Sequence, residues 1–125
     1  MEKRFLIVDD DEIYNFICKE IVKRSGYACH IEEFTNSYEA LQYLKNIDRM
    51  PDVILIDINI PFLDGWTFIE KLRDHENFDS KKSKIFIQSS SIYEKDIERA
   101  NQHDLISGFI IKPLSMEQLS IIFSK

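Results

Sequence analysis

The chain has 125 residues, of which 44% are hydrophobic and 30% are charged, and it contains only three glycines and three prolines. A chain of this length can bury a hydrophobic core, and its composition excludes a linker or a disordered tail. The formal net charge of −6 disfavours direct binding to nucleic acid, whose phosphate backbone is also negative. We therefore expect one globular domain over residues 1–125.

The two cysteines, Cys18 and Cys29, lie in apolar segments, without the spacing of a redox pair or of metal ligands. We expect both to be reduced residues of the core. No apolar stretch has the length of a bilayer span, and no apolar run follows a positively charged start. These features predict a cytoplasmic location.

Short apolar runs alternate with segments of helical periodicity from the first residues onward. Residues 5–8 predict a buried first strand, which ends at a run of aspartates. A helix is expected over about 12–25, and Ser25 and Gly26 can end it. Its buried face is predicted from apolar residues at helical spacing: Ile13, Phe16, Ile17 and Ile21.

The middle of the chain predicts a weaker strand, a second helix and a central strand. The weaker strand covers about 28–34, and Asn36 or Ser37 can cap the helix that follows. The apolar side of this helix is expected to consist of Tyr38, Leu41, Leu44 and Ile47. Residues 52–57 form a nearly continuous apolar run, as is typical of a parallel strand buried on both faces, with Asp57 at its carboxyl end.

Three helices and two strands are expected in the remaining part. Asp64 can cap a third helix, whose apolar stripe contains Trp66, Ile69 and Leu72. After an exposed connection, the predicted elements are a strand at 85–87, a mostly polar helix at about 94–104, a strand at 109–111 and a last helix from about Ser115.

Strands that are each followed by a helix predict a parallel sheet, because right-handed crossovers place helices on both of its faces. The expected fold class is therefore α/β, a doubly wound sandwich. In such sheets ligands bind at the carboxyl ends of the strands, near the point where the strand order reverses.

Polar residues stand at the carboxyl ends of four predicted strands: Asp9 and Asp10, Asp57, Ser89, and Lys112. Carboxylates brought together repel one another, so a proton or a cation must stabilise them, and Mg²⁺ prefers such oxygen ligands. Transfer of a phosphoryl group to a carboxylate is a known form of nucleophilic catalysis, and Asp57 is the best candidate nucleophile. Mg²⁺ and Lys112 would supply positive charge, and Ser89 a hydrogen bond.

The sequence resembles the response-regulator receiver domains of two-component signalling over essentially its whole length. The resemblance rests on motifs in the family's order: Leu6-Ile7-Val8-Asp9-Asp10, Ile54-Leu55-Ile56-Asp57 with Pro61 and Asp64-Gly65, Ser89-Ser90, and Lys112-Pro113. It implies a flavodoxin-like (βα)5 fold with strand order 2-1-3-4-5, as in the chemotaxis regulator of this family. Because the sequence stops after the last predicted helix, we expect a stand-alone receiver, or else a domain excised from a longer regulator.

The resemblance implies a role for each acidic residue of the predicted site. Asp57 would accept the phosphoryl group, and Asp10 and Asp57 would be direct ligands of Mg²⁺ or Mn²⁺. Asp9 would act through a coordinated water or through orientation, and Asn59 would give its backbone carbonyl to the metal.

The resemblance also implies a switching mechanism. Phosphorylation would draw Ser89 toward the phosphoryl group and turn Phe109 inward, changing the face formed by the fourth helix, the fifth strand and the fifth helix. The Lys112-Pro113 peptide would be cis and would direct Lys112 into the site. Gln88 stands where an apolar strand residue is more usual, and the sequence gives no account of it.

The expected function is a signalling phosphoacceptor, not an enzyme with a separate substrate, although it would catalyse its own phosphorylation and dephosphorylation. The donor would be a phosphohistidine on a sensor histidine kinase or a phosphotransfer protein, and the output an unidentified protein target. One alternative is a receiver-like interaction module that works without phosphorylation. Another is an aspartyl-phosphate phosphohydrolase, although such enzymes commonly have an aspartate where this chain has Asn59.

Overall fold

The computed structural model describes residues 2–27 and 30–124. Its five parallel strands form one sheet in the order β2-β1-β3-β4-β5. The strands are β1 (Arg4–Val8), β2 (His30–Phe34), β3 (Val53–Asp57), β4 (Lys84–Ser89) and β5 (Ile106–Ile111). The helices are α1 (Glu12–Ser25), α2 (Ser37–Asn46), α3 (Gly65–Arg73), α4 (Glu94–Gln102) and α5 (Met116–Ser124). This arrangement confirms the predicted doubly wound, flavodoxin-like fold and its strand order.

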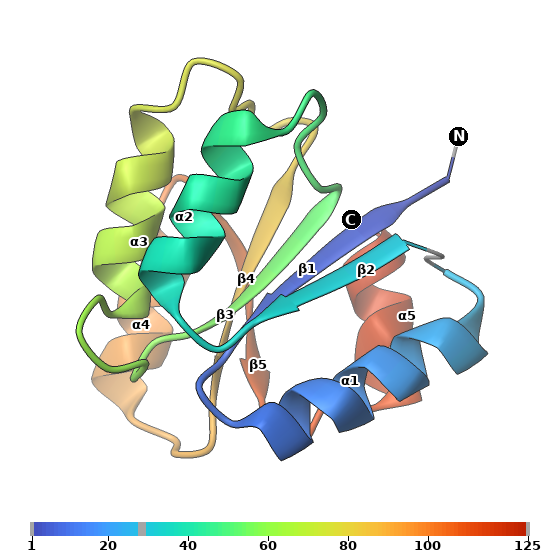
Figure 1. Ribbon diagram of the computed structural model, residues 1–125. Coiled ribbons are helices and arrows are strands. Elements are labelled where there is room, and N and C mark those ends of the chain that lie inside the picture. Colours follow the sequence, from blue (N-terminus) through green and yellow to red (C-terminus); the bar gives the residue numbers. More distant parts are fainter. Residues whose placement is uncertain (1, 28–29, 125) are drawn as a thin grey trace.

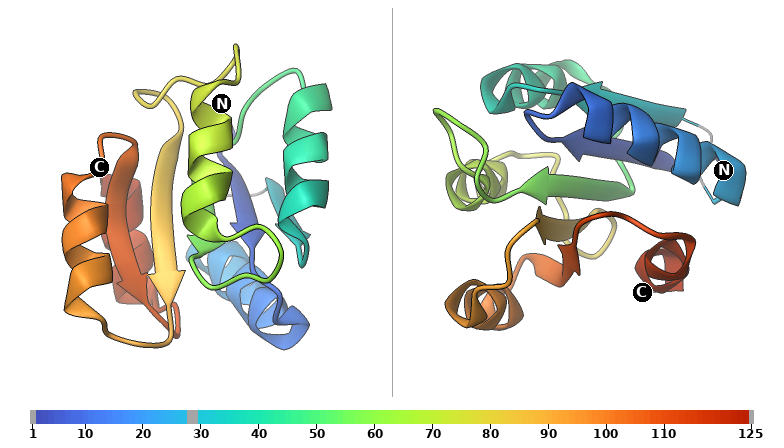
Figure 2. Two further views of the ribbon diagram at one scale, coloured as in Figure 1. Left: turned by 90° about the vertical axis from the view of Figure 1, so that its left-hand side faces the viewer. Right: turned by 90° about the horizontal axis from the view of Figure 1, so that it is seen from below.

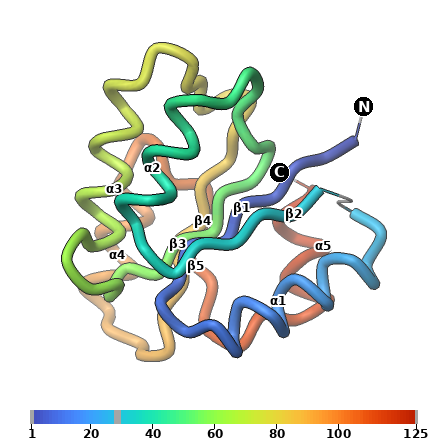
Figure 3. The backbone as a smooth tube through the Cα atoms, viewed as in Figure 1, coloured from blue at the N-terminus to red at the C-terminus, as the bar shows by residue number. Residues whose placement is uncertain are grey.

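The helices cover the two faces of the sheet unequally. Helices α1 and α5 lie on one face, and α2, α3 and α4 lie on the other (Figures 1 and 2). Figure 3 follows the chain as it crosses from one face to the other. All neighbouring strands pair in parallel. The carboxyl ends of the strands therefore lie at the same edge of the sheet.

Alternate residues of the central strands supply two hydrophobic cores, because successive strand side chains point to opposite faces. Phe5 and Leu55 belong to the core under α1 and α5. Leu6 and Ile54 belong to the core under α2 and α3, where Phe68 also packs. Every residue of β3 is buried, which confirms the central position predicted for this strand.

The ends of the first three helices have typical capping residues. The Asp11 carboxylate accepts hydrogen bonds from the backbone at the start of α1, and Asn36 and Asp64 cap α2 and α3 in the same way. Gly26 ends α1 in the left-handed conformation, at φ 77°, where a side chain would be strained. The predicted ends of α1 and the predicted caps Asn36 and Asp64 are confirmed.

The predicted buried face of α1 was wrong. Ile13 is 74% exposed and Phe16 61% exposed, Ile17 is also exposed, and Ile21 packs only partly against the core. The buried residues are Tyr14, Asn15, Cys18 and Val22. Tyr14, Cys18 and Val22 form a second stripe at a spacing of four residues, and the buried amide of Asn15 donates to the backbone carbonyl of Asp9 at 2.8 Å. Helix α1 therefore faces the core with this more polar stripe instead of with the predicted apolar one.

Smaller differences concern α2 and the ends of several elements. Tyr38 of α2 is 53% exposed rather than buried, because Ser37, Ala40 and Leu44 form the inner face. Strands β4 and β5 are longer than the predicted 85–87 and 109–111, since they pair with each other from Ile85 and Ile106 to Ser89 and Ile111. Helix α4 ends at Gln102 instead of about residue 104.

Two predictions fall partly outside the described residues. Ala28 and Cys29 belonged to the expected second strand, and they lie outside the described part of the chain. Cys18 is a free, buried cysteine, as expected. Burial raises the pKa of its thiol to about 11.

Within residues 2–27 and 30–124, no helix is both long and apolar enough to cross a membrane.

Candidate functional site

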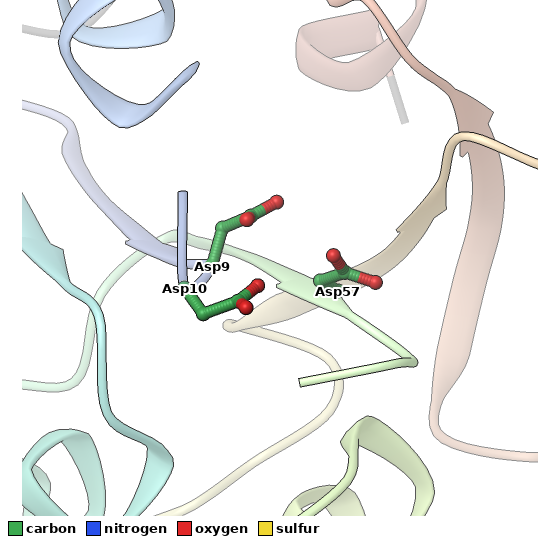
Figure 4. A group of neighbouring side chains, drawn as sticks. All are labelled: Asp9, Asp10 and Asp57. Atoms are coloured by element: carbon green, nitrogen blue, oxygen red, sulfur yellow. The ribbon is translucent and has the colours of Figure 1, made fainter. Parts of the chain in front are cut away.

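The predicted acidic residues converge at the carboxyl edge of the sheet. Asp9 and Asp10 follow β1, and Asp57 is the last residue of β3, the neighbouring strand. One carboxylate oxygen from each of these three residues lies within 4.8 Å of the others (Figure 4). Asp9 and Asp57 are buried, whereas Asp10 is exposed. The parallel topology thus brings together side chains that are 48 residues apart in the sequence, from Asp9 to Asp57.

Lys112, which follows β5, lies against two of these carboxylates. Its ammonium donates to Asp57 Oδ2 at 2.9 Å and forms an ion pair with Asp9 Oδ2. Burial lowers the pKa of Lys112, but its hydrogen bonds to Asp9 and Asp57 outweigh burial and leave the pKa raised. The Lys112-Pro113 peptide is cis, as expected. Lys112 is therefore a charged counter-ion for the cluster.

Asp9 is the most deeply buried carboxylate of the cluster, at 0% exposure. Burial raises its pKa to about 6, although the hydrogen bond from Lys112 opposes this shift. Asp9 Oδ1 accepts from the backbone N–H of Asp11 at 3.0 Å, and Oδ2 accepts from Gln88 Nε2 at 3.0 Å. Both oxygens of Asp9 already accept hydrogen bonds, while Asp10 presents its carboxylate at the surface.

Gln88 has a structural explanation that the sequence did not provide. Its side chain is fully buried, donates to Asp9, and accepts a hydrogen bond from the Tyr14 hydroxyl at 2.7 Å. Tyr14 was not among the predicted site residues. A polar residue inside an apolar strand was the one available signal, and it marked Gln88 without indicating its partners.

Of the other predicted site residues, Asn59 contacts Asp57, whereas Ser89 and Phe109 make contacts elsewhere. The Asn59 backbone N–H donates to Asp57 Oδ1 at 2.9 Å. Ser89 is buried at the end of β4, and its hydroxyl lies 3.3 Å from the Ser91 hydroxyl and accepts from the Ser91 backbone at 3.2 Å. Phe109 is half-buried on β5 and packs against the core under α2 and α3.

The start of α3 lies directly against the strand end that carries Asp57. The Gly65 backbone N–H donates to the carbonyl of Ile58 at 3.2 Å. A Cβ atom on Gly65 would lie 2.9 Å from the Asp57 carbonyl oxygen and from Ile58 Cα, too close for any ordinary contact. Glycine is therefore required here so that α3 can approach Asp57.

The residues present fit a hard divalent cation. Three carboxylates offer oxygen ligands within 4.8 Å of one another, and one lysine supplies less positive charge than these carboxylates carry when ionised. Mg²⁺ prefers oxygen ligands and is commonly held by one or two carboxylates together with phosphate oxygens.

A doubly wound sheet with an acidic cluster, a hydroxyl and a lysine at its carboxyl edge defines a receiver-type module. Residues 5–123 match the family described as response regulator receiver domain. The chain belongs to this family, whose general function is phosphorylation on an aspartate and signalling in two-component systems.

Similar proteins include a sensor histidine kinase and response regulators of known structure. The sensor histidine kinase CheAY of Helicobacter pylori is 32% identical over 120 residues, which cover 96% of this chain but only 14% of the kinase. A two-component response regulator from Cytophaga hutchinsonii superposes with a TM-score of 0.92 at 28% identity, covering 98% of this chain and 95% of that chain.

A third similar protein is the receiver domain of the sensor histidine kinase PA1611 from Pseudomonas aeruginosa PAO1. That structure holds a magnesium ion coordinated in its active site cleft. It superposes with a TM-score of 0.79 at 20% identity, covering 99% of this chain and 96% of that chain. At this level of identity the likeness shows the shared fold.

Proposed function

We propose that this chain accepts a phosphoryl group on Asp57 from a phosphohistidine, in a reaction that requires Mg²⁺ or Mn²⁺. One observation carries the proposal: the Asp57 carboxylate ends a buried central strand, lies within 4.8 Å of Asp9 and Asp10, and is hydrogen-bonded to Lys112. The donor would be a sensor histidine kinase or a histidine phosphotransfer protein. The similarity to part of a sensor histidine kinase supports this class of donor.

The protein's contribution to the reaction is positioning and counter-charge. One Asp57 oxygen attacks the phosphorus atom, and an O–P bond forms while the N–P bond to the donor histidine breaks. The Asn59 N–H and the Lys112 ammonium already hold the two carboxylate oxygens of Asp57 and so restrict its orientation. Lys112 is then placed to contact the incoming phosphoryl oxygens.

Asp10 and Asp57 would bind the metal directly, with the backbone carbonyl of Asn59. Asp9 would act through a coordinated water or through orientation, and it is the most deeply buried carboxylate of the three. When bound, Mg²⁺ would offset the negative charge of the carboxylates and of the phosphoryl oxygens. The solved PA1611 receiver with its coordinated magnesium supports this choice of metal.

Signalling would follow from a change of hydrogen-bond partner at Ser89. Its hydroxyl, now beside Ser91, would turn to a phosphoryl oxygen on Asp57, and half-buried Phe109 would turn inward. The α4-β5-α5 face would thereby change shape for a protein target. Slow self-catalysed hydrolysis of the acyl phosphate would end the signal.

We further infer that residues 1–125 act as a single receiver domain in the cytoplasm. The output would be docking to a protein or onward transfer of the phosphoryl group. The net charge of −6 supports a protein partner over direct nucleic-acid binding.

Intact mass spectrometry tests the proposal directly. The purified chain is incubated with MgCl₂ and acetyl phosphate, alongside Asp57→Asn and the control Asp64→Asn, which changes a nearby helix cap. We expect one added phosphoryl group in the wild-type and control chains, and none in Asp57→Asn or in the presence of EDTA.

No adduct and no beryllofluoride binding would favour the phosphorylation-independent module. Rapid multiple turnover of a small phosphate ester would instead favour a phosphohydrolase.

A further inference from the structure

Four side chains beside the acidic cluster form a closed ring of contacts. The Tyr14 hydroxyl donates to Gln88 Oε1 at 2.7 Å, and Gln88 Nε2 donates to Asp9 Oδ2 at 3.0 Å. Asp9 Oδ2 is paired with Lys112, whose Nζ lies 4.6 Å from the centre of the Tyr14 ring. The ring joins α1, β4 and the segments that follow β1 and β5. Each of the four contacts therefore joins residues that are far apart in the sequence.

The direction of each hydrogen bond in this ring is fixed by chemistry. An ionised carboxylate only accepts hydrogen bonds, so the amide nitrogen of Gln88 must face Asp9. The amide oxygen of Gln88 then faces Tyr14, whose hydroxyl must be the donor. Burial raises the pKa of Tyr14, so the hydroxyl keeps its proton. Because Gln88 is fully buried, loss of either partner leaves a polar group without a replacement from solvent.

The ring restricts the positions of Asp9 and Lys112 next to Asp57. Gln88 fixes Asp9 Oδ2, while the Asp11 N–H fixes Oδ1, so the carboxylate has little freedom to rotate. The Tyr14 ring covers one side of the Lys112 ammonium, which spans Asp9 and Asp57. Movement of Gln88 would therefore free Asp9 Oδ2 to shift, and Lys112, which is paired with that oxygen, could shift with it.

We propose that Gln88 and Tyr14 are positioning residues for this site. They set the placement of Asp9 and Lys112 relative to Asp57, and thereby the affinity for Mg²⁺ and the rate at which Asp57 is phosphorylated. This inference rests on the proposed function but assigns it two further residues. Neither side chain donates or accepts a hydrogen bond with Asp57, so they act through Asp9 and Lys112.

The test compares Gln88→Leu, Tyr14→Phe and the double variant with the control Phe86→Leu. Phe86 is buried on the same face of β4, two residues before Gln88, and packs in the core under α1 and α5. For each protein, calorimetry measures Mg²⁺ affinity without a phosphodonor, mass spectrometry measures the phosphorylation rate at saturating Mg²⁺, and thermal unfolding measures stability.

We expect Gln88→Leu to weaken Mg²⁺ binding and to slow phosphorylation by about tenfold each, as is typical for loss of an outer-shell partner. Each single variant should lose stability, because it leaves a buried polar partner unpaired. The double variant removes both polar groups, so it should regain part of the stability but neither the Mg²⁺ affinity nor the rate. Phe86→Leu should lose stability and keep both.

Three results would overturn the inference: an unchanged Gln88→Leu site, recovery of Mg²⁺ affinity together with stability in the double variant, or an equal loss of affinity in Phe86→Leu. Failure of the proposed function looks different. A wild-type chain that binds Mg²⁺ but is never phosphorylated would refute that function, while the Mg²⁺ measurements would still decide the positioning role. A wild-type chain without Mg²⁺ binding would overturn both.

Discussion

Asp9 and Asp57 are buried carboxylates that share the ammonium group of Lys112. Burial disfavours the ionised form of a carboxyl group, whereas the nearby cation favours it. For Asp9 burial has the larger effect, and its pKa is raised to about 6. The site therefore holds a carboxylate whose charge destabilises the metal-free fold.

The sign of this effect gives a pH-dependent prediction for Asp9→Asn in EDTA. The folded-state pKa of about 6 lies above the ordinary 3.8, so the folded state binds the proton more tightly than the unfolded chain. The resulting stabilisation is complete below the ordinary pKa and is lost as pH rises through about 6. Asp9→Asn should therefore raise the thermal midpoint by a few degrees at pH 7.5 and by less at pH 5. Equal shifts at both pH values would contradict this account.

At the scale of elements, the site depends on how closely helices approach the sheet. The start of α3 lies against the end of β3 because Gly65 has no side chain. Farther along α3, the guanidinium of Arg73 donates to both carboxylate oxygens of Asp104, at 2.7 and 2.8 Å, and His103 Nε2 lies 2.8 Å from Glu70. Helix α3 thus contacts the end of β3 at one end and the segment after α4 at the other.

Gly65→Ala should disturb the site without changing any of its charged residues. The added methyl group would lie 2.9 Å from the Asp57 carbonyl, so either α3 or the strand end must move. We expect a loss of about 1–3 kcal/mol in the free energy of unfolding, as for other overpacked sites. Phosphorylation by acetyl phosphate should also slow. Urea unfolding and an intact-mass time course would measure the two effects, and wild-type values in both would contradict the close approach.

Helix α4 is expected to be held more firmly at its end than at its start. Hydrogen bonds from Arg73 lower the pKa of Asp104 to about 2, whereas the side chain of Tyr93 makes no capping hydrogen bond at the start of α4. Amide hydrogen exchange should thus be faster in the first turn of α4 than in its last turn. Arg73→Ala should reduce this difference, and the exposed control Lys71→Ala should not. Uniform exchange along wild-type α4 would contradict the prediction.

At the scale of the whole molecule, the topology could be predicted because the central strands are marked by their composition. The continuous apolar run before Asp57 identifies a strand buried on both faces, and parallel order then places Asp9, Asp57 and Lys112 at one edge. The orientation of α1 could not be predicted in this way. Its apolar residues cover more than one face, and the choice between them depends on packing against β1 and α5.

The link between Tyr14 and Gln88 was also beyond sequence reasoning. These residues are 74 positions apart, and their hydrogen bond exists only after α1 has packed against the sheet. Local periodicity describes single elements, so it can mark Gln88 as unusual in an apolar strand but cannot identify its partner. The general position of the site was predictable, whereas the side chains that support it required the folded structure.

We propose that the whole fold presents one aspartate, Asp57, for phosphorylation. The most direct test is to phosphorylate the chain with acetyl phosphate and MgCl₂, reduce the acyl phosphate with borohydride, and locate the resulting homoserine by tandem mass spectrometry. We predict homoserine at position 57 alone. Homoserine at Asp9, Asp10 or another aspartate, with Asp57 unmodified, would contradict the account.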